Sequence, residues 1–307
     1  MAHNVLVVGE GMVELSSAAP NCLWRMGSGG DTLNTALHLA RLGCEVSFAS
    51  VLGSDPFSLE MRESWIREGL NVDTVLTDPQ RTAGLYAIHT DDKGERSFTY
   101  WRRESAARYL FEHPDIARVE AAAERADLLI FSLISLAVLP PEGRQRLIDL
   151  AKRAVQRGGK VAFDGNYRPA LWDNLTGARR ARDAAIALCE FGLPTLDDER
   201  AIDGPADPEQ VAARWARGGA KEVVVKLGAK GCLTAGGLVA PPVSLKPVDT
   251  TGAGDAFNAG YLHARLNQEG VVAAAKAGHK LAAWTVMQHG GIPTITPDAP
   301  YAQLEAL

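Results

Sequence analysis

The sequence is poor in the features that mark exported or metal-binding proteins. It has only 4 cysteines in 307 residues, widely scattered and without CxxC or Cys/His ligand spacing. We therefore expect buried, reduced thiols rather than disulfides or a metal site at Cys22, Cys44, Cys189 and Cys232. The N-terminus leads directly into a strand-like run, with no basic or cleavable segment. These absences predict a cytoplasmic protein.

Long apolar runs and an excess of positive charge are also lacking. The run from Leu128 to Leu139 has 12 residues, contains two serines and is too short to span a bilayer. With 32 Lys+Arg against 37 Asp+Glu, the formal net charge of −5 offers no general attraction for nucleic acid. The Walker P-loop ending is missing, and no GxGxxG follows a strand, which disfavours a dinucleotide dehydrogenase. Neither a membrane nor nucleic acid is an expected partner.

What the sequence does have is a regular alternation of apolar, strand-like runs with amphipathic stretches. Runs such as Asn4–Gly9 and Glu45–Ala49 alternate with stretches of helical period such as Thr32–Leu42, and glycines mark the connections. No linker-like stretch divides the chain. The pattern predicts a single α/β domain over residues 1–307, with a mostly parallel sheet and helices on both faces.

One segment breaks this alternation. Gly84–Thr90 and Glu95–Arg102 flank the turn-forming residues DDKG, which predicts a β-hairpin. Met12–Trp24 lacks a helical period and is expected to pair with this hairpin. Together they would form a small antiparallel sheet, from about residues 12–27 and 83–106, that projects from the α/β body as a lid. A surface arm used only for dimerisation is the alternative.

The strongest local signal is DTTGAGDAF, which begins at position 249 and opens a helix-like run. Gly252, Ala253 and Gly254 leave backbone N–H groups uncovered at a helix N-terminus, where the helix dipole favours a phosphate oxygen. Asp255 suits another role, because a carboxylate repels phosphate but accepts the proton of an incoming hydroxyl during phosphoryl transfer. A helix cap made by Thr251 or Asp255 is the alternative.

A second glycine-rich element, GSGGDTLN, opens the helix predicted near the N-terminus. Gly29 and Gly30 would let a ligand approach the backbone closely, while Asp31 and Asn34 supply polar groups at the helix entrance. Capping by Asp31 or Thr32 is the alternative interpretation.

Two weaker elements follow predicted strands. KLGAKG, from Lys226 to Gly231, is a turn that can hold a nucleotide phosphate but equally well forms a hairpin. DGNYRP, from Asp164 to Pro169, lies at the strand ends where open α/β sheets bind ligands. A solvent-exposed side chain in a turn is the alternative for Arg168.

GGDTLNTALHLARLG near the start and DTTGAGDAF near the end resemble the two signature regions of the ribokinase-like (pfkB) carbohydrate kinases, and the resemblance covers essentially the whole chain. It implies a three-layer ribokinase-like fold and Mg²⁺-assisted transfer of the ATP γ-phosphate to a sugar-like hydroxyl. Asp255 would be the catalytic base, and Gly252, Ala253 and Gly254 the anion hole. The other nucleotide-binding residues implied are Asn166, Arg168, Lys226, Gly228 and Gly231, and the sugar-binding residues are Gly29, Gly30, Asp31 and Asn34.

Within the family the chain most resembles the 2-keto-3-deoxygluconate kinases, in GGDTLN at 29–34, GLY at 84–86, TYWR at 99–102, DGNYRP at 164–169 and TLDDE at 195–199. That resemblance implies phosphorylation of the terminal 6-hydroxyl of a sugar acid. A sugar acid needs fixed cations, and Arg102 and Arg168 are expected to converge on its carboxylate. Tyr86 and Tyr100, on the two hairpin strands, would pack on the ligand or donate hydroxyls. A solvated rim charge for Arg102 and dimer packing for Tyr100 and Trp101 are the alternatives.

The metal-organising residues depart from the family pattern. Many members carry Asn-x-x-Glu, whereas this chain has TLDD at 195–198, so Asp198 or Glu199 is the candidate for arranging Mg²⁺ through water. Asp249 resembles a monovalent-cation residue of some relatives, without enough support to predict that site. The helix Ala273–Gln288 and the HGGIP turn after it are expected to help form the adenine pocket.

Other functions stay open. A fructokinase or ribokinase acting on a neutral sugar would not need Arg168. A non-catalytic sugar-acid or nucleotide sensor would have no need for Asp255, and a purely structural dimer module leaves four polar, glycine-rich elements unexplained. We therefore expect a sugar-acid kinase that uses ATP and Mg²⁺ and forms a homodimer or higher homo-oligomer through the small sheet.

Overall fold

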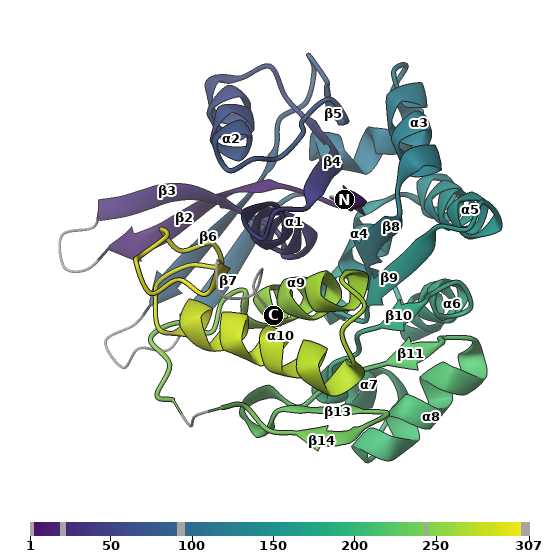
Figure 1. Cartoon of the computed structure of the whole chain (residues 1–307). Helices are drawn as coiled ribbons and strands as arrows, with labels where there is room; N and C mark the ends of the chain where they lie inside the picture. Colours follow the sequence, from purple (N-terminus) through teal and green to yellow (C-terminus); the bar gives the residue numbers. More distant parts are fainter. Residues whose placement is uncertain (1–2, 19–22, 91–95, 243–244, 302–307) are drawn as a thin grey trace.

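The computed structural model describes residues 3–18, 23–90, 96–242 and 245–301, and its centre is a parallel sheet (Figure 1). Within those ranges the strand order is β11-β10-β9-β8-β1-β4-β5, and every neighbouring pair is parallel. The strands are β1 (Asn4–Val8), β4 (Glu45–Leu52), β5 (Val75–Thr77), β8 (Leu128–Ser132), β9 (Lys160–Asp164), β10 (Phe191–Gly192) and β11 (Glu222–Val223). Because parallel strands end at one edge, the segments that follow β1, β8 and β9 meet there.

Helices cover both faces of this sheet, so the predicted three-layer arrangement is confirmed (Figure 1). Successive side chains of a strand point to opposite faces, and accordingly Val5 and Val7 of β1 pack in one core cluster and Leu6 and Val8 in the other. The first cluster includes side chains of α1 (Asp31–Arg41), α2 (Pro56–Arg67), α9 (Ala253–Leu266) and α10 (Val271–Val286). The second includes those of η1 (Ala106–Glu112), α3 (Ala117–Arg125), α4 (Leu133–Val138), α5 (Pro141–Gln156), α6 (Leu175–Ile186), α7 (Leu196–Asp203) and α8 (Pro208–Gly218).

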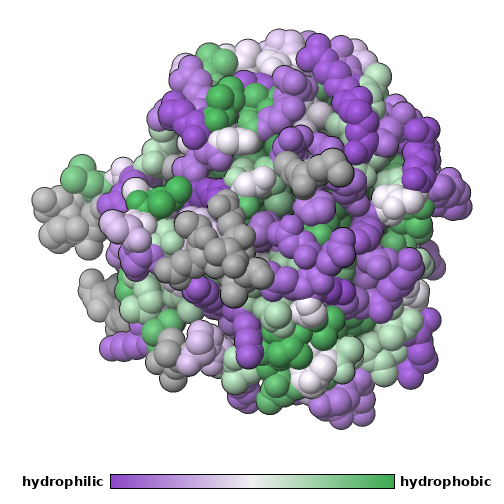
Figure 2. Space-filling view, viewed as in Figure 1, coloured by the Kyte–Doolittle hydropathy of each residue, from purple (hydrophilic) through white to green (hydrophobic). Residues whose placement is uncertain are grey.

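The outer surface differs from these two apolar cores in its polarity. Figure 2, drawn from the same side as Figure 1, shows a mostly hydrophilic face with smaller apolar areas. Cys44, Cys189 and Cys232 are buried free thiols, as predicted, while Cys22 lies outside the described residues. Within the described part of the chain, no helix has the length and apolar character needed to cross a membrane.

A second sheet projects from one side of the body (Figure 1), with strand order β3-β2-β6-β7. β2 (Met12–Ala18) pairs antiparallel with β3 (Leu23–Gly29), and β6 (Gly84–Thr90) pairs antiparallel with β7 (Arg96–Trp101). The predicted hairpin is confirmed, although its DDKG turn lies outside the described residues. The sheet is mixed rather than antiparallel as predicted, because β2 and β6 both run outward from the body and pair in parallel. We refer to these four strands as the projecting sheet.

A third, antiparallel sheet joins β12 (Val225–Lys226), β13 (Cys232–Thr234) and β14 (Gly237–Val239). The KLGAKG element forms the hairpin between the first two of these strands, with the 3-10 turn η3 (Gly228–Lys230) at its tip. Residues Glu222–Lys226 (EVVVK) form a continuous strand-like run in the sequence, yet the structure divides them between β11 of the central sheet and β12 of this hairpin.

Trp65 of α2 connects the projecting sheet to the body. Its indole is fully buried, packs edge-on against Phe48 of β4 with 5.4 Å between ring centroids, and donates from Nε1 to Ser28 Oγ of β3 at 3.1 Å. A Cβ at Gly11 would lie 2.5 Å from this ring, so only glycine lets the chain pass between β1 and β2 here. The position of the projecting sheet therefore depends on this packing.

We expect Trp65→Ala to lower the free energy of unfolding by about 3–5 kcal/mol, because it leaves a cavity where a buried indole packed. Phe57→Ala on the same helix is the control, since that ring is 54% exposed and its loss should change stability by about 0.5 kcal/mol or less. Urea denaturation followed by circular dichroism measures both. Equal effects of the two substitutions would contradict the role assigned to Trp65.

Candidate active site

Four aspartates from different elements gather at the carboxyl edge of the central sheet. Asp31 begins α1, Asp164 ends β9, Asp198 lies in the first turn of α7, and Asp255 lies in the first turn of α9. Hydrogen bonds link the segments that carry them, since Asn34 of α1 donates to Asp255 at 2.8 Å and Asn166, two residues after Asp164, donates to Asp31 at 3.2 Å. The charges of Asp31 and Asp164 also oppose the ionisation of Asp255, and the charge of Asp164 opposes that of Asp198. We refer to these four residues as the aspartate cluster.

Asp255 is held in an environment that favours its protonated form. Burial, reinforced by the charges of Asp31 and Asp164, raises its pKa to about 8. The Asn34 side chain works in the opposite direction by donating from Nδ2 to Asp255 Oδ2 at 2.8 Å. A carboxyl group whose pKa lies near neutral pH has the proton affinity that a general base needs.

The N-terminus of α9, which carries Asp255, is not capped by a side chain in the described part of the chain. Its N-cap residue, Gly252, has φ 72°, and a Cβ there would lie 2.5 Å from the Cα of Gly291, so the position requires glycine. The amide of Ala253 makes a long hydrogen bond of 3.3 Å to the Thr250 carbonyl. The capping alternative is therefore not observed, and the positive end of the helix dipole faces the aspartate cluster.

Asp249 fixes the loop that leads into this helix. Its carboxylate accepts from the amide of Thr251 at 2.7 Å and from that of Gly290 at 2.8 Å, which ties the DTTG segment to the HGGIP turn. The next residue in that turn, Gly291, approaches Asn34 so closely that a Cβ would lie 2.7 Å from Asn34 Nδ2. The two signature segments of the sequence are thus in contact through the HGGIP turn.

A buried ion pair stands behind the N-terminus of α9. Lys226 Nζ donates to Asp164 Oδ1 at 2.9 Å and to Asn258 Oδ1 at 3.1 Å, and Asn258 Nδ2 donates to Asp164 Oδ2 at 2.8 Å. The ammonium lies 3.8 Å from the place a Cβ of Gly254 would take. Lys226 is thus satisfied by protein groups, while Gly228 in the adjoining turn is exposed and Gly231 is buried.

The DGNYRP segment joins the cluster from the next strand end. Asn166 Nδ2 donates to Asp31 Oδ2 at 3.2 Å, which links this segment to the GGDTLN segment. The Arg168 side chain is 51% exposed, and its Nη1 lies 3.6 Å from Asp198 Oδ1. Burial raises the pKa of Asp198 to about 6, although Arg168 opposes that shift.

The two metal candidates from the sequence have different surroundings. Asp198 belongs to the aspartate cluster, whereas the fully buried Glu199 carboxylate lies 3.2 Å from Arg182 Nη1 and 3.7 Å from Arg214 Nη1. The Glu199 carboxylate thus belongs to an ion-pair network between α6, α7 and α8. Of the pair, only Asp198 is available to the site.

The projecting sheet presents Tyr86 to the cluster. The Tyr86 side chain is buried, its hydroxyl donates to Glu14, and a Cβ on Gly29 would lie 2.1 Å from that hydroxyl oxygen. Burial raises the pKa of Tyr86, with Asp255 among the charges that add to the shift. Tyr100 stacks on Tyr86 with 5.9 Å between ring centroids and is 49% exposed.

Arg102 is buried instead of being a solvated rim charge, so that alternative is wrong. Its side chain is 9% exposed and forms an ion pair with Glu10, the residue two positions after β1. The guanidinium is electrostatically coupled to Asp31. Arg168 thus lies beside Asp198 of the cluster, whereas Arg102 is paired with Glu10, next to the Gly30 backbone that leads into Asp31.

Three contributors to the site were not identified from the sequence: Glu10, Glu14 and Asn258. Asn258 lies three residues after Asp255, so helical spacing places it on a neighbouring part of the same helix face. Glu10 follows β1 at the edge where the other site segments meet, which is the signal that would have found it. Glu14 offers no such signal beyond its register opposite Tyr86.

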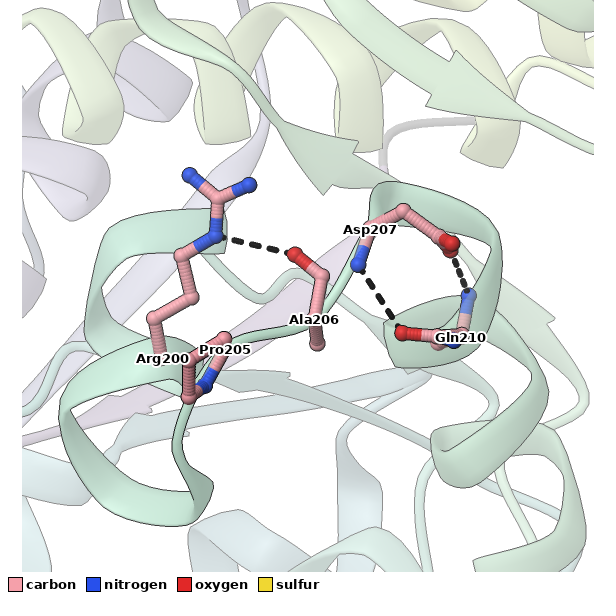
Figure 3. A pocket seen from close by; sticks show the side chains of 5 residues that line it. All are labelled: Arg200, Pro205, Ala206, Asp207 and Gln210. Atoms are coloured by element: carbon pink, nitrogen blue, oxygen red, sulfur yellow. Dashed lines mark hydrogen bonds between the residues drawn. The ribbon is translucent and has the colours of Figure 1, made fainter.

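A surface hollow between α7 and α8 contains none of the predicted site residues (Figure 3). It is lined by Arg200, Pro205, Ala206, Asp207 and Gln210. Its polar groups satisfy one another, since Arg200 Nε donates to the Ala206 carbonyl at 2.9 Å and Asp207 and Gln210 form the capping box of α8. The hollow therefore contributes nothing to the functional assignment.

The raised pKa of Asp255 makes stability depend on pH. Because the unfolded carboxyl ionises near its ordinary pKa of 3.8 while the folded one ionises near 8, the favourable contribution of this group is complete below pH 4 and is lost as pH rises to 8. The loss amounts to about 1.4 kcal/mol per pH unit across that interval. We expect Asp255→Asn to be more stable than the parent by a few kcal/mol at pH 8 and similar to it at pH 4. Urea titrations at a series of pH values measure the difference, and a difference that does not change with pH would contradict the assignment.

The chain is similar to known proteins both in sequence and in fold. The chain matches the pfkB family of carbohydrate kinases over residues 2–299. It is 43% identical over 304 residues to the 2-dehydro-3-deoxygluconokinase of Escherichia coli K12, covering 95% of this chain and 97% of that protein. It is 41% identical over 299 residues to the 2-dehydro-3-deoxygluconokinase of Dickeya dadantii, covering 94% and 96%.

The fold comparison agrees with the sequence comparison. The crystal structure of a PfkB protein from Polaromonas sp. JS666 has a TM-score of 0.83 and 30% identity, and covers 100% of both chains. The ribokinase-like fold that the motifs implied is therefore confirmed, together with the resemblance on which it was based. This chain belongs to the pfkB family of carbohydrate kinases.

Proposed function

We propose that this ATP-dependent carbohydrate kinase acts on 2-keto-3-deoxygluconate and phosphorylates its terminal 6-hydroxyl. The observation that carries the proposal is the position of two arginines at the site of the buried carboxyl group Asp255. Arg168 Nη1 lies 3.6 Å from Asp198 Oδ1 of the cluster, and Arg102 is paired with Glu10, whose backbone is approached closely by Gly30, the residue before Asp31. A sugar acid brings a carboxylate, for which arginine side chains supply charge-assisted hydrogen bonds. The names of the two curated relatives described above support the same substrate.

Asp255 would accept the proton of the attacking hydroxyl. Asn34 holds Asp255 Oδ2 at 2.8 Å, which leaves Oδ1 for the substrate. As the hydroxyl oxygen bonds to the γ-phosphorus, its proton passes to Asp255 and the bond from that phosphorus to the ADP oxygen breaks. The raised pKa of Asp255 makes the proton transfer favourable near neutral pH.

Negative charge on the transferring phosphoryl group would be stabilised by the N-terminus of α9. Gly252, Ala253 and Gly254 form this helix end, and the Lys226 ammonium stands directly behind it. A buried cation and the helix dipole act together there in a site of low dielectric constant. The nucleotide would lie along Asn166, Arg168, and the turn with Gly228 and Gly231.

Mg²⁺ fits this site through few protein ligands. The described residues contain no group of three or more His, Cys, Asp or Glu side chains arranged to hold a metal ion. Mg²⁺ typically keeps several waters and binds through one or two carboxylates together with the phosphates of its nucleotide. Asp198 is the carboxylate of the cluster that would hold it, and Mg²⁺ would there neutralise charge on the ATP phosphates.

The projecting sheet would act as the lid of the site. Tyr86 and Tyr100 share its face toward the aspartate cluster, and Gly29, Gly30, Asp31 and Asn34 lie where β3 passes into α1. Covering the sugar acid from this side would exclude the water that otherwise hydrolyses ATP.

Coupled measurement of ATP turnover with 2-keto-3-deoxygluconate, fructose, ribose and gluconate tests the substrate. We expect preference for 2-keto-3-deoxygluconate, a loss of kcat of about 10²–10⁴-fold in Asp255→Asn, and a KM for the keto acid raised about tenfold or more in Arg168→Ala. Arg180→Ala, which removes an exposed arginine of α6, is the control.

Two outcomes of this assay would point elsewhere. If the protein prefers fructose or ribose and Arg168→Ala leaves the KM unchanged, the protein is a kinase of neutral sugars and the proposed sugar-acid substrate is wrong. Sugar-acid binding without any ATP turnover would indicate the non-catalytic sensor.

We further propose a cytoplasmic homodimer joined through the outer face of the projecting sheet. Trp24, Met26 and Trp101 are 49%, 41% and 59% exposed, and the strand register places them on the face opposite Tyr86. Trp24 and Met26 lie on the edge strand β3 and Trp101 on the opposite edge strand β7, and exposed apolar side chains that share one face of a sheet are typical of interaction surfaces. Dimer packing, the alternative for the Tyr100–Trp101 pair, thus suits Trp101.

Sedimentation analysis tests this interface. We expect Trp24→Ser combined with Trp101→Ser to shift the protein from dimer to monomer, since both changes remove apolar contact area. Leu238→Ser, which alters a 65% exposed side chain on β14, should leave the dimer intact. A parent protein that sediments as a monomer would contradict the proposal.

A further inference from the structure

The four places where the chain passes between the body and the projecting sheet meet at Glu10. Glu10 itself lies between β1 and β2. Gly30, between β3 and α1, approaches its backbone so closely that a Cβ would lie 2.2 Å from the Glu10 carbonyl oxygen. A Cβ on Gly84, which begins β6, would lie 2.7 Å from Glu10 Oε1. Arg102, which follows β7, forms an ion pair with the Glu10 carboxylate.

The Glu10–Arg102 ion pair is buried, and it involves only one carboxylate oxygen of Glu10 and one edge of the Arg102 guanidinium. The side chains of Glu10 and Arg102 are 1% and 9% exposed. Arg102 donates from Nε to Glu10 Oε2 at 2.7 Å, and its Nη2 donates to the same oxygen. Glu10 Oε1 is buried without a hydrogen-bond partner in the described part of the chain. The ion pair with Glu10 therefore fixes the Nε–Nη2 edge of the Arg102 guanidinium.

The remaining side of the guanidinium is the one available to a ligand. Arg102 Nη1 has no hydrogen-bond partner among the described residues. The guanidinium carbon lies 5.9 Å from the centroid of the Tyr100 ring, and the group is electrostatically coupled to Asp31 at the start of α1. One edge is thus held by Glu10, while the group stays near the residues expected to bind the sugar acid.

We propose that Glu10 is a positioning residue for the substrate carboxylate, acting through Arg102 at the hinge of the projecting sheet. This inference rests on the proposed function, in which Arg102 binds that carboxylate. A long arginine side chain loses rotamer freedom when it binds a ligand, and an existing ion pair removes much of that cost beforehand. Glu10 also lets the arginine remain buried while no ligand is bound, because a buried cation without a partner is strongly destabilising.

The geometry also links substrate recognition to the position of the sheet. Gly30, Gly84 and Arg102 all contact the same glutamate. The residue proposed to position the arginine thus also lies where the projecting sheet joins the body.

Steady-state kinetics of Glu10→Gln test the proposal, with 2-keto-3-deoxygluconate as the probe. Glutamine keeps the shape of the side chain but removes the charge that holds the guanidinium. We expect the KM for the sugar acid to rise about tenfold, with kcat and the KM for ATP changed by about twofold or less. A role confined to stability would not produce this split.

A double-mutant cycle shows whether Glu10 acts through the arginine. We expect Glu10→Gln to add little to the KM in an Arg102→Gln background, because the group that it positions is already gone. Glu222→Gln is the matched control: Glu222 accepts from Arg265 Nε at 2.9 Å and from its Nη2 at 2.8 Å, in the last turn of α9, whereas Asp255 lies in the first turn. The loss of the Glu222 charge should lower the Tm without raising the KM for the sugar acid.

The outcomes distinguish a failure of the positioning role of Glu10 from a failure of carboxylate binding by Arg102. If Arg102→Gln raises the KM but Glu10→Gln leaves it unchanged, or if their effects multiply, the positioning role is wrong and the proposed function stands. If Arg102→Gln itself leaves the KM unchanged, carboxylate binding by Arg102 is wrong. Should Glu10→Gln fail to fold, Glu10→Asp, which withdraws the carboxylate by one methylene, must show the same rise in KM for the sugar acid alone.

Discussion

The burial of negative charge at the carboxyl edge of the central sheet is the constraint on which the site depends. Burial opposes the ionisation of Asp255, and the charges of Asp31 and Asp164 in the same cluster add to that effect. Lys226 and Asn258 offset the charge of Asp164, and Asn34 offsets that of Asp255. An arrangement of this kind is costly for a folded protein, because like charges repel strongly where water is excluded. The same cost gives Asp255 a proton affinity suited to a hydroxyl.

The architecture supplies the rigid support that such a cluster requires. Parallel strands buried on both faces end at one edge, and each cluster residue is fixed there at a strand end or in the first turn of a helix. The loop before α9 is held by Asp249 and by the close approach of Gly252 to Gly291. The projecting sheet, by contrast, is joined to the body through a few close contacts around Glu10 and Trp65. A site formed by the rigid edge of the central sheet and by a projecting sheet with separate connections is suited to a reaction that must exclude water.

The two arginines illustrate different uses of the same charge. Arg168 is half exposed and lies against the carboxylate of Asp198, whereas Arg102 is buried and gripped by Glu10. An exposed arginine is free to follow a ligand, while a buried one presents its remaining donors in a fixed direction. In the proposed function, the fixed arginine orients the carboxylate of the sugar acid, and the exposed one adds attraction for the same carboxylate and for the nucleotide.

The sequence by itself determined the elements and the identity of the principal groups. Helical and strand periods located α1 and α9 with their glycine-rich entrances and the hairpin of β6 and β7, since these signals are local. The family resemblance, carried by short motifs, singled out Asp255 as the expected base. Only the tertiary structure decided the partners: that Lys226 is paired with Asp164, that Glu199 turns toward Arg182, that β2 runs parallel to β6, and that Arg102 is held by Glu10. These pairings join residues far apart in the chain, and which charges meet is set by strand order, register and burial, none of which is written in the residues flanking each charge.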